Sequence, residues 1–273
     1  MTENWNYQKA DSKKEPVAPQ MKKEKAASKQ SLTTPAIVLP ATYTKQEGVR
    51  ESFLFVIISG GEKREKDYFS AIELGKMGRR IKLITLSAIK GAGGFTPQQL
   101  YGYALNAVQR KYVEKNNDRF NLQENDRFFL LTDVDQFTGL KRIIYLCQYR
   151  RFNLIVSNPC FEIWLYYSYF NQPEKDLALL SSQDCQVSWK LKRLIDSLRP
   201  GGIDPRKAIG ELETAIKHSI EKYKEEEVGF PGFLSTQMFL LGKDLKENLL
   251  DDLAIWKQQE QNRIQEYKKK KLL

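Results

Sequence analysis

The sequence predicts an α/β protein with a mostly parallel β-sheet that helices cover on both faces. Between residues 52 and 170, short apolar runs alternate with amphipathic segments. The runs are continuously apolar, which is typical of parallel strands buried on both faces. Acidic residues follow several of the runs, at the position where open α/β sheets bind their ligands.

Composition divides the chain of 273 residues into three parts. Residues 1–50 are polar and lysine-rich, so they cannot bury enough apolar surface to offset the entropy of ordering, and we expect them to be disordered. We expect the α/β domain over residues 51–172. Residues 173–273 are expected to form a helical region with charged faces, which completes that domain or packs on it.

The expected strands are the four apolar runs, at Phe53–Ser59, Ile81–Ser87, Arg127–Thr132 and Phe152–Ser157. Segments with helical periodicity follow them, over residues 66–78, 97–116, 139–149 and 158–170. The helix expected over 97–116 has apolar residues such as Leu100 and Ala104 on one face. In the last segment we expect the aromatic side chains to be core, and not a platform for stacking bases; they are Trp164, Tyr166 and Tyr167.

Composition also restricts the chemistry. The single histidine, His218, cannot build a His-rich metal site, and the three cysteines are too far apart for a disulfide framework or a zinc site. A metal would therefore be bound through oxygen, which favours Mg²⁺ or Mn²⁺. The net charge of +10 suits a partner rich in phosphate. No signal-peptide core or bilayer-spanning apolar run is present, so we expect a cytoplasmic protein without a membrane segment.

The strongest local feature is a set of carboxylates at expected strand ends. Glu62 follows the first strand, and Asp133 and Asp135 end the third, where their spacing of two makes them face the same way. Carboxylates this close resist joint ionisation unless a cation such as Mg²⁺ lies among them. Simpler roles are also open, since an Asp often caps the next helix and Glu62 could be a solvated loop acid. The glycine-rich stretch after the second strand lacks the ending of a P-loop, which argues against ATP binding there.

The order strand–GGE, strand–DxD, strand–NPxFE resembles the Toprim fold, the catalytic domain shared by topoisomerases, primases and several nucleases. Three stretches narrow the resemblance: GEKREKDYF at 61–69, DVDQF at 133–137 and SNPCFEIWLYYSYF at 157–170. They are similar to signatures of the RloB-like family, which are Toprim-type bacterial proteins linked to phage defence and restriction loci. Members are often encoded beside an AAA/ABC-type ATPase. The resemblance covers about residues 52–250.

The resemblance implies roles for individual residues. In the family pattern the first-motif Glu and the DxD bind Mg²⁺, and the glutamate of NPxFE joins them as a catalytic residue; here these are Glu62, Asp133, Asp135 and Glu162. Around them we expect phosphate contacts from four basic residues, Lys63, Arg64, Lys66 and Lys90, and support for the ligands from Glu65 and Asn158. Two positions depart from the pattern: Arg64 replaces a threonine, and Ser168 lies where a histidine often ends the last motif. The second departure removes a candidate general acid or base.

The resulting hypothesis is a Mg²⁺-dependent nuclease acting on DNA or RNA, as the effector of an anti-phage system with an ATPase partner. Its oligomeric state is left open. The alternative is a non-catalytic Toprim-like scaffold or regulatory subunit of an ATPase complex, which the missing histidine favours. A phosphotransferase of the haloacid dehalogenase type also uses DxD, but there the pair ends the first strand, whereas here it ends the third.

Overall fold

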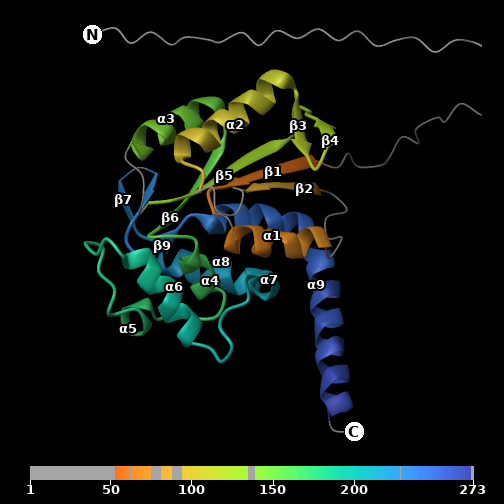
Figure 1. Ribbon diagram of the computed structural model, residues 1–273, viewed down its shortest axis with the longest axis vertical. Coiled ribbons are helices and arrows are strands. Elements are labelled where there is room, and N and C mark those ends of the chain that lie inside the picture. Colours follow the sequence, from red (N-terminus) through yellow and green to blue (C-terminus); the bar gives the residue numbers. More distant parts are fainter. Residues whose placement is uncertain are drawn as a thin grey trace, which may run out of the picture. The chain divides into compact units, whose positions relative to one another are not determined.

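The core of the protein is a five-stranded β-sheet with the strand order β2-β1-β5-β6-β9 (Figure 1). The computed structural model describes residues 53–61, 63–74, 81–87, 94–134, 139–227 and 229–271. Strand β1 (Phe53–Ser59) pairs in parallel with β2 (Ile81–Ser87) and with β5 (Arg127–Asp133). Strand β5 in turn pairs in parallel with β6 (Asn153–Asn158). The expected mostly parallel α/β sheet is confirmed.

Helices cover both faces of the sheet because the side chains of each strand alternate between the faces. Val56 and Ile58 of β1 pack with α2 (Pro97–Arg110) and α3 (Leu140–Arg150). Phe55 and Ile57 pack on the other face, in the larger core that contains α1 (Arg64–Leu74) and α4 (Glu162–Tyr167). Figure 1 shows α2 and α3 on one side of the strands and α1 and α4 on the other.

The helix expected over residues 97–116 is shorter in the structure, which corrects the sequence-based prediction. Helix α2 ends at Arg110, because Lys111 adopts the left-handed conformation with φ 61°. A β-hairpin follows, formed by β3 (Tyr112–Lys115) and β4 (Asp118–Asn121). Asn116 and Asn117, with φ 53° and 69°, form the turn between the strands. Two adjacent positive φ values are typical of a type I′ hairpin turn, and asparagine tolerates them better than most residues.

The C-terminal part is mostly helical, as expected, but it also contributes strands that the sequence did not indicate. Strands β7 (Glu225–Glu227) and β8 (Phe230–Pro231) form a small hairpin, and β9 (Ser235–Thr236) adds to the main sheet, antiparallel to β6. Segments from this part therefore complete the sheet itself. The helices are α5 (Pro173–Asp176), α6 (Val187–Ser197), α7 (Pro205–Ala208), a single 3₁₀ turn η1 (Ile209–Glu211), α8 (Leu212–Lys222) and α9 (Met238–Lys271).

Helix α9 is buried over its first half and exposed over its second. Leu241, Leu245 and Leu249 are almost fully buried in the larger core, whereas residues 261–270 are all exposed. Among the described helices, α9 included, none has an apolar stretch long enough to cross a membrane. His218 of α8 is half-buried, and its Nδ1 lies 3.0 Å from the carbonyl oxygen of Tyr167, so it links α8 to α4.

Candidate acidic site at the carboxyl ends of the strands

The parallel strands bring several polar residues to one edge of the sheet. Asp133 is the last residue of β5, and its register partner on β6 is Ser157. The turn after β1 lies beside the end of β5, because the Gly60 amide donates a hydrogen bond to the Leu131 carbonyl at 3.0 Å. The chain on either side of position 62, at Gly61 and Lys63, therefore reaches the same edge as Asp133.

Three of the residues expected in the site lie outside the described residues: Glu62, Asp135 and Lys90. Asp133 is thus the one member of the expected metal-binding set that the structure describes. Within the described ranges, no three His, Cys, Asp or Glu side chains are grouped so as to hold a metal ion. The role of the full set as metal ligands stays a prediction.

Two buried glutamates lie at this edge, and both were expected near the site. Glu65 is 7% exposed and Glu162 is 4% exposed. Burial raises the pKa of Glu65 from its ordinary value of 4.5 to about 7, and the neighbouring charge of Glu162 adds to the rise. A carboxylate that is removed from water and close to a second one binds its proton more tightly. The site therefore contains a carboxyl group that titrates near neutral pH.

Glu65 packs directly on the turn that follows β1. A Cβ atom added at Gly61 would lie 1.9 Å from the Glu65 carboxylate oxygen Oε2, so any larger residue at this position would displace the carboxylate. The second glycine of the GGE motif thus leaves room for the carboxylate of Glu65. This contact ties the beginning of α1 to the turn that contains position 62.

Two cations compensate the buried charge of Glu162. Its Oε1 atom lies 3.5 Å from Nε of Arg64 and 3.7 Å from Nζ of Lys192. Arg64 also donates a hydrogen bond from Nη2 to Oδ2 of Asp196 at 2.7 Å. A buried carboxylate is stable in the folded protein only if it is paired in this way. The Arg64 side chain, one of the two departures from the family pattern, is therefore built into the acidic site.

Lys192 and Asp196 contact the residues of this site, and the sequence analysis did not identify them. Burial opposes protonation of Lys192, but the carboxylate of Glu162, with further contributions from Cys160, Asp133 and Glu65, raises its pKa above the ordinary value. The one available signal was spacing: Lys192 and Asp196 are four residues apart on the amphipathic helix α6, and therefore share a face. Nothing local in the sequence indicated that this face meets Glu162.

Cys160 lies among the same charged groups. Burial raises the pKa of the Cys160 thiol well above its ordinary value, and the carboxylates of Glu162 and Asp133 contribute to the rise. The long-range interactions of Cys160 and Lys192 thus place Asp133 in the same electrostatic cluster as Glu65 and Glu162. We refer to Glu65, Asp133, Cys160, Glu162 and Lys192 as the acidic cluster.

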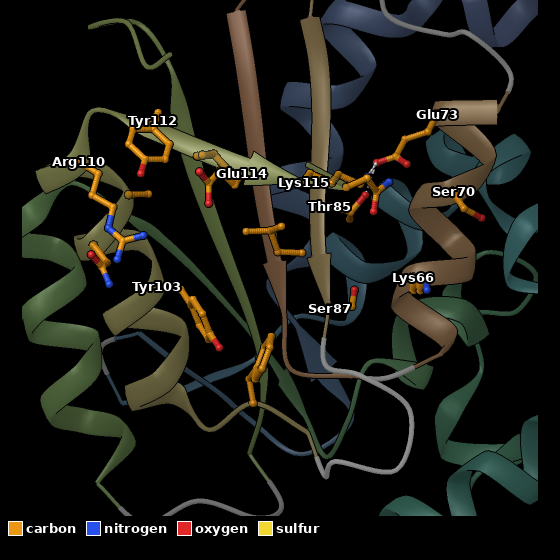
Figure 2. A pocket seen from close by; sticks show the side chains of 16 residues that line it. Lys66, Ser70, Glu73, Thr85, Ser87, Tyr103, Arg110, Tyr112, Glu114 and Lys115 are labelled. Carbon is orange, nitrogen blue, oxygen red and sulfur yellow. Dashed lines mark hydrogen bonds and ion pairs between the residues drawn. The ribbon is translucent and has the colours of Figure 1, made fainter. Parts of the chain in front are cut away.

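The expected phosphate contacts divide between two cavities. Lys63 and Arg64 line a cavity of about 710 Å³, together with Arg206 of α7. Lys66 instead lines a second cavity, of about 850 Å³, next to the edge strand β2 (Figure 2). The Nη1 atom of Arg64 is buried and has no hydrogen-bond partner within the described part of the chain. A buried guanidinium nitrogen without a partner is an unsatisfied hydrogen-bond donor inside the site.

Other predicted residues have structural roles. Asn158 is half-buried and donates a hydrogen bond from Nδ2 to the Pro231 carbonyl at 2.9 Å, and the peptide bond to Pro159 is cis. Ser168, the second departure from the family pattern, is buried and donates a hydrogen bond to the Trp164 carbonyl at 3.2 Å. The prediction that the aromatic residues of this segment form core is confirmed, since Trp164, Tyr166 and Tyr167 are 0% exposed.

The fold and the site together define an α/β protein with a buried acidic cluster at the carboxyl ends of parallel strands. A family model described as RloB-like protein matches residues 55–245, which include the whole of this cluster. The chain belongs to the RloB-like family. Neither the curated proteins nor the solved structures include a match to the chain.

Proposed function

We propose that the protein is a Mg²⁺-dependent nuclease of the Toprim type, acting on DNA or RNA. The observation that carries the proposal is the acidic cluster: Asp133 ends a central parallel strand beside two buried glutamates, and cations flank them. Open α/β sheets bind ligands at this edge. Membership of the RloB-like family and the order of the GGE, DxD and NPxFE motifs support the same function.

The residue types that the sequence places at this edge would suit a hard divalent cation. The groups at this edge offer carboxylate oxygens, the ligands that Mg²⁺ and Mn²⁺ prefer, and the described part of the cluster contains no histidine. Burial, with the neighbouring charge of Glu162, raises the pKa of Glu65 to about 7, and a cation nearby would favour its ionised form. We propose that Glu62, Asp133 and Asp135 would hold the metal. When bound, Mg²⁺ would polarise the scissile phosphate and neutralise the charge that develops on it.

The chain's own groups would orient the substrate and handle protons. Arg64 and Lys63, which line the cavity of about 710 Å³, would attract the phosphate there by their positive charge, while Arg64 stays bound to Glu162 and Asp196. Lys192 would stabilise negative charge at the same place. Glu65, whose pKa is about 7, is the group at this edge best suited to accept or donate a proton near neutral pH.

The experiment is a cleavage assay on supercoiled plasmid DNA and on RNA, with Mg²⁺, with Mn²⁺ and with a chelator. We expect cleavage with either metal, and none with the chelator. Glu62→Ala and Asp133→Ala should each abolish it, whereas Asp118→Ala, which changes an exposed acid on β4, should leave it intact. Activity that survives both Glu62→Ala and Asp133→Ala would refute the assignment.

A second candidate function is a non-catalytic subunit of a defence complex that docks on an ATPase. The observation that favours it is Ser168: a buried serine bonded to a backbone carbonyl occupies the place where the family often has histidine. Under the first proposal, the protein would be the effector that such an ATPase controls. Co-expression with any ATPase encoded beside this gene distinguishes the two. A stable complex without cleavage, with or without ATP, would support the scaffold.

A further inference from the structure

The cavity beside β2 has features of its own that the acidic cluster does not explain. Its volume is about 850 Å³, within the range of sites for small organic ligands. Figure 2 shows side chains entering it from α1 on one side and from α2 and β3 on the other, with the edge strand β2 between them. The ion pair between Glu73 and Lys115, 2.6 Å long, spans these two sides. We call this space the edge cleft.

An aromatic surface lines the edge cleft. Tyr103 is 49% exposed, and its ring packs on Phe95 with the centroids 5.0 Å apart and an angle of 45° between the rings. One face of α2 is turned to the cleft. Its residues follow one another at helical spacing: Tyr103, Asn106, Ala107 and Arg110. The Phe95 ring is in tilted contact with the Tyr103 ring, and about half of the surface of the Tyr103 residue remains accessible.

The cleft also carries unpaired positive charge. Lys66 and Arg110, and the acidic Glu114, make no ion pair with any residue in the described ranges, whereas Lys115 is neutralised by Glu73. The unpaired groups of the cleft are therefore two cations and one carboxylate. The hydroxyl groups of Ser70 on α1 and of Ser87 at the end of β2 also line the cleft (Figure 2). An accessible aromatic ring with nearby cations and hydroxyls matches the two halves of a nucleotide, a flat base and an anionic phosphate.

The edge cleft adjoins the turn that contains position 62. The Phe95 amide donates a hydrogen bond to the Gly60 carbonyl at 3.0 Å, so the aromatic pair is fixed to the turn that follows β1. Ser87, the last residue of β2, shares a hydroxyl hydrogen bond of 2.9 Å with Ser59, the last residue of β1. The cleft therefore opens at the carboxyl ends of the strands, where Asp133 also lies.

From this arrangement we propose that the edge cleft binds one unpaired nucleotide of the nucleic-acid strand that enters the acidic cluster. The base would stack on Tyr103, and the phosphate groups would lie near Lys66 and Arg110. A base inside a duplex has both faces covered by its neighbours, so stacking on Tyr103 requires a single-stranded or flipped-out nucleotide. The proposal rests on the proposed nuclease function and adds its substrate class, a single strand or an unpaired segment.

The test measures binding without divalent metal, so that no cleavage takes place. Fluorescence anisotropy compares a labelled oligothymidylate and oligouridylate of about 12 nucleotides, within the usual site size of single-strand-binding folds, with a duplex of equal length. We expect the single strands to bind more tightly. Tyr103→Leu should weaken their binding about ten-fold, because it removes the stacking surface. The matched control is Tyr145→Leu on α3, where the tyrosine is 67% exposed and outside the cleft; it should change nothing.

Two results would overturn the proposal: equal binding of single strands and duplex, or equal affinity of the Tyr103→Leu and Tyr145→Leu variants for the single strands. Displacement of the labelled strand by a mononucleotide as effectively as by an unlabelled oligonucleotide would assign the cleft to a free nucleotide instead. Ultraviolet crosslinking of a 5-iodouracil oligonucleotide locates the contact, with Tyr103 as the expected site. Binding and cleavage are measured separately, so the failures of the two proposals are distinguishable: cleavage that survives Glu62→Ala and Asp133→Ala refutes the nuclease assignment, whereas equal affinity of Tyr103→Leu and Tyr145→Leu refutes the edge cleft.

Discussion

Nε of Arg64, the first residue of α1, lies 3.5 Å from the carboxylate of Glu162, the first residue of α4. The two residues come from motifs almost a hundred positions apart, and both are mostly buried, with side chains 23% and 5% exposed. The contact joins the segment that follows β1 to the segment that follows β6. It therefore holds two sides of the acidic cluster together.

We expect Arg64→Ala to destabilise the protein by about 1–3 kcal/mol, because Glu162 would lose one of the two cations that it contacts in the described structure and keep Lys192. Urea unfolding of Arg64→Ala, Glu162→Gln and the double variant measures the coupling. The loss from Arg64→Ala should be smaller in the Glu162→Gln background, where no buried charge is left unpaired. Strictly additive effects would show that the contact contributes nothing to stability.

The pH dependence of the unfolding free energy should show the titration of Glu65. Its pKa in the folded protein is about 7, above the ordinary value of 4.5, so the folded state holds this proton more tightly than the unfolded state. The stability that this proton contributes is fully present below pH 4.5, the ordinary pKa. It is lost as the pH rises through the folded-state pKa of about 7. With a chelator present, the free energy of unfolding of Glu65→Gln should rise relative to that of the unchanged protein between pH 5 and about 7. A difference that stays constant over this range would contradict the assignment.

Two glycines offer opposite tests of packing. A Cβ atom at Gly94 would lie 2.6 Å from the Gly60 carbonyl oxygen, and backbone would have to move. Gly94→Ala should therefore cost about 1–3 kcal/mol of unfolding free energy.

Gly102 is exposed within α2, and nothing lies within 4 Å of an added Cβ atom. Gly102→Ala should stabilise by about 0.5–1 kcal/mol, since alanine is the better helix former. Thermal unfolding compares the pair, and a stabilising Gly94→Ala would refute the close approach of the two turns.

The three thiols should differ sharply in reactivity. Cys147 and Cys160 are buried, and burial raises the pKa of Cys147 to about 12 and that of Cys160 above its ordinary value. Cys185 is exposed. Because the thiolate is the reactive form, only Cys185 should react rapidly with a maleimide in the folded protein. All three should react in urea, and Cys185→Ser should remove the rapid phase. Fast labelling of Cys160 would place the acidic cluster closer to solvent than the structure does.

The parallel strands could be predicted because continuous apolar runs identify strands buried on both faces, and all four were found within one residue of their expected bounds. The end of α2 was missed because Lys111 adopts a left-handed conformation that its side chain does not favour. Asn116 and Asn117 could have indicated the hairpin turn, since asparagine is common at such positions. Strand β9 could not have been found, because two residues carry no periodicity.

The position of Asp133 followed from a rule about sheets, since the carboxyl ends of parallel strands share an edge. No such rule predicts the partners of Glu162. Lys192 and Asp196 reach the cluster only because α6 packs against α4, and that packing depends on contacts between residues distant in the sequence. Local patterns could therefore indicate where acids gather, but not which cations neutralise them.

Strand β6, at whose end the NPxFE motif begins, is completed by a segment that is synthesised much later. The amide of Val156 is bound by the side chain of Gln237, the hydroxyl of Ser157 by Thr236, and the side chain of Asn158 by the Pro231 carbonyl. During translation, a nascent chain that ends before Gln237 leaves this side of β6 without its neighbour. The order of synthesis thus imposes an order of assembly, in which the acidic edge is among the last parts of the sheet to be finished. An incomplete polypeptide would carry the motifs of the site without the framework that holds them in place.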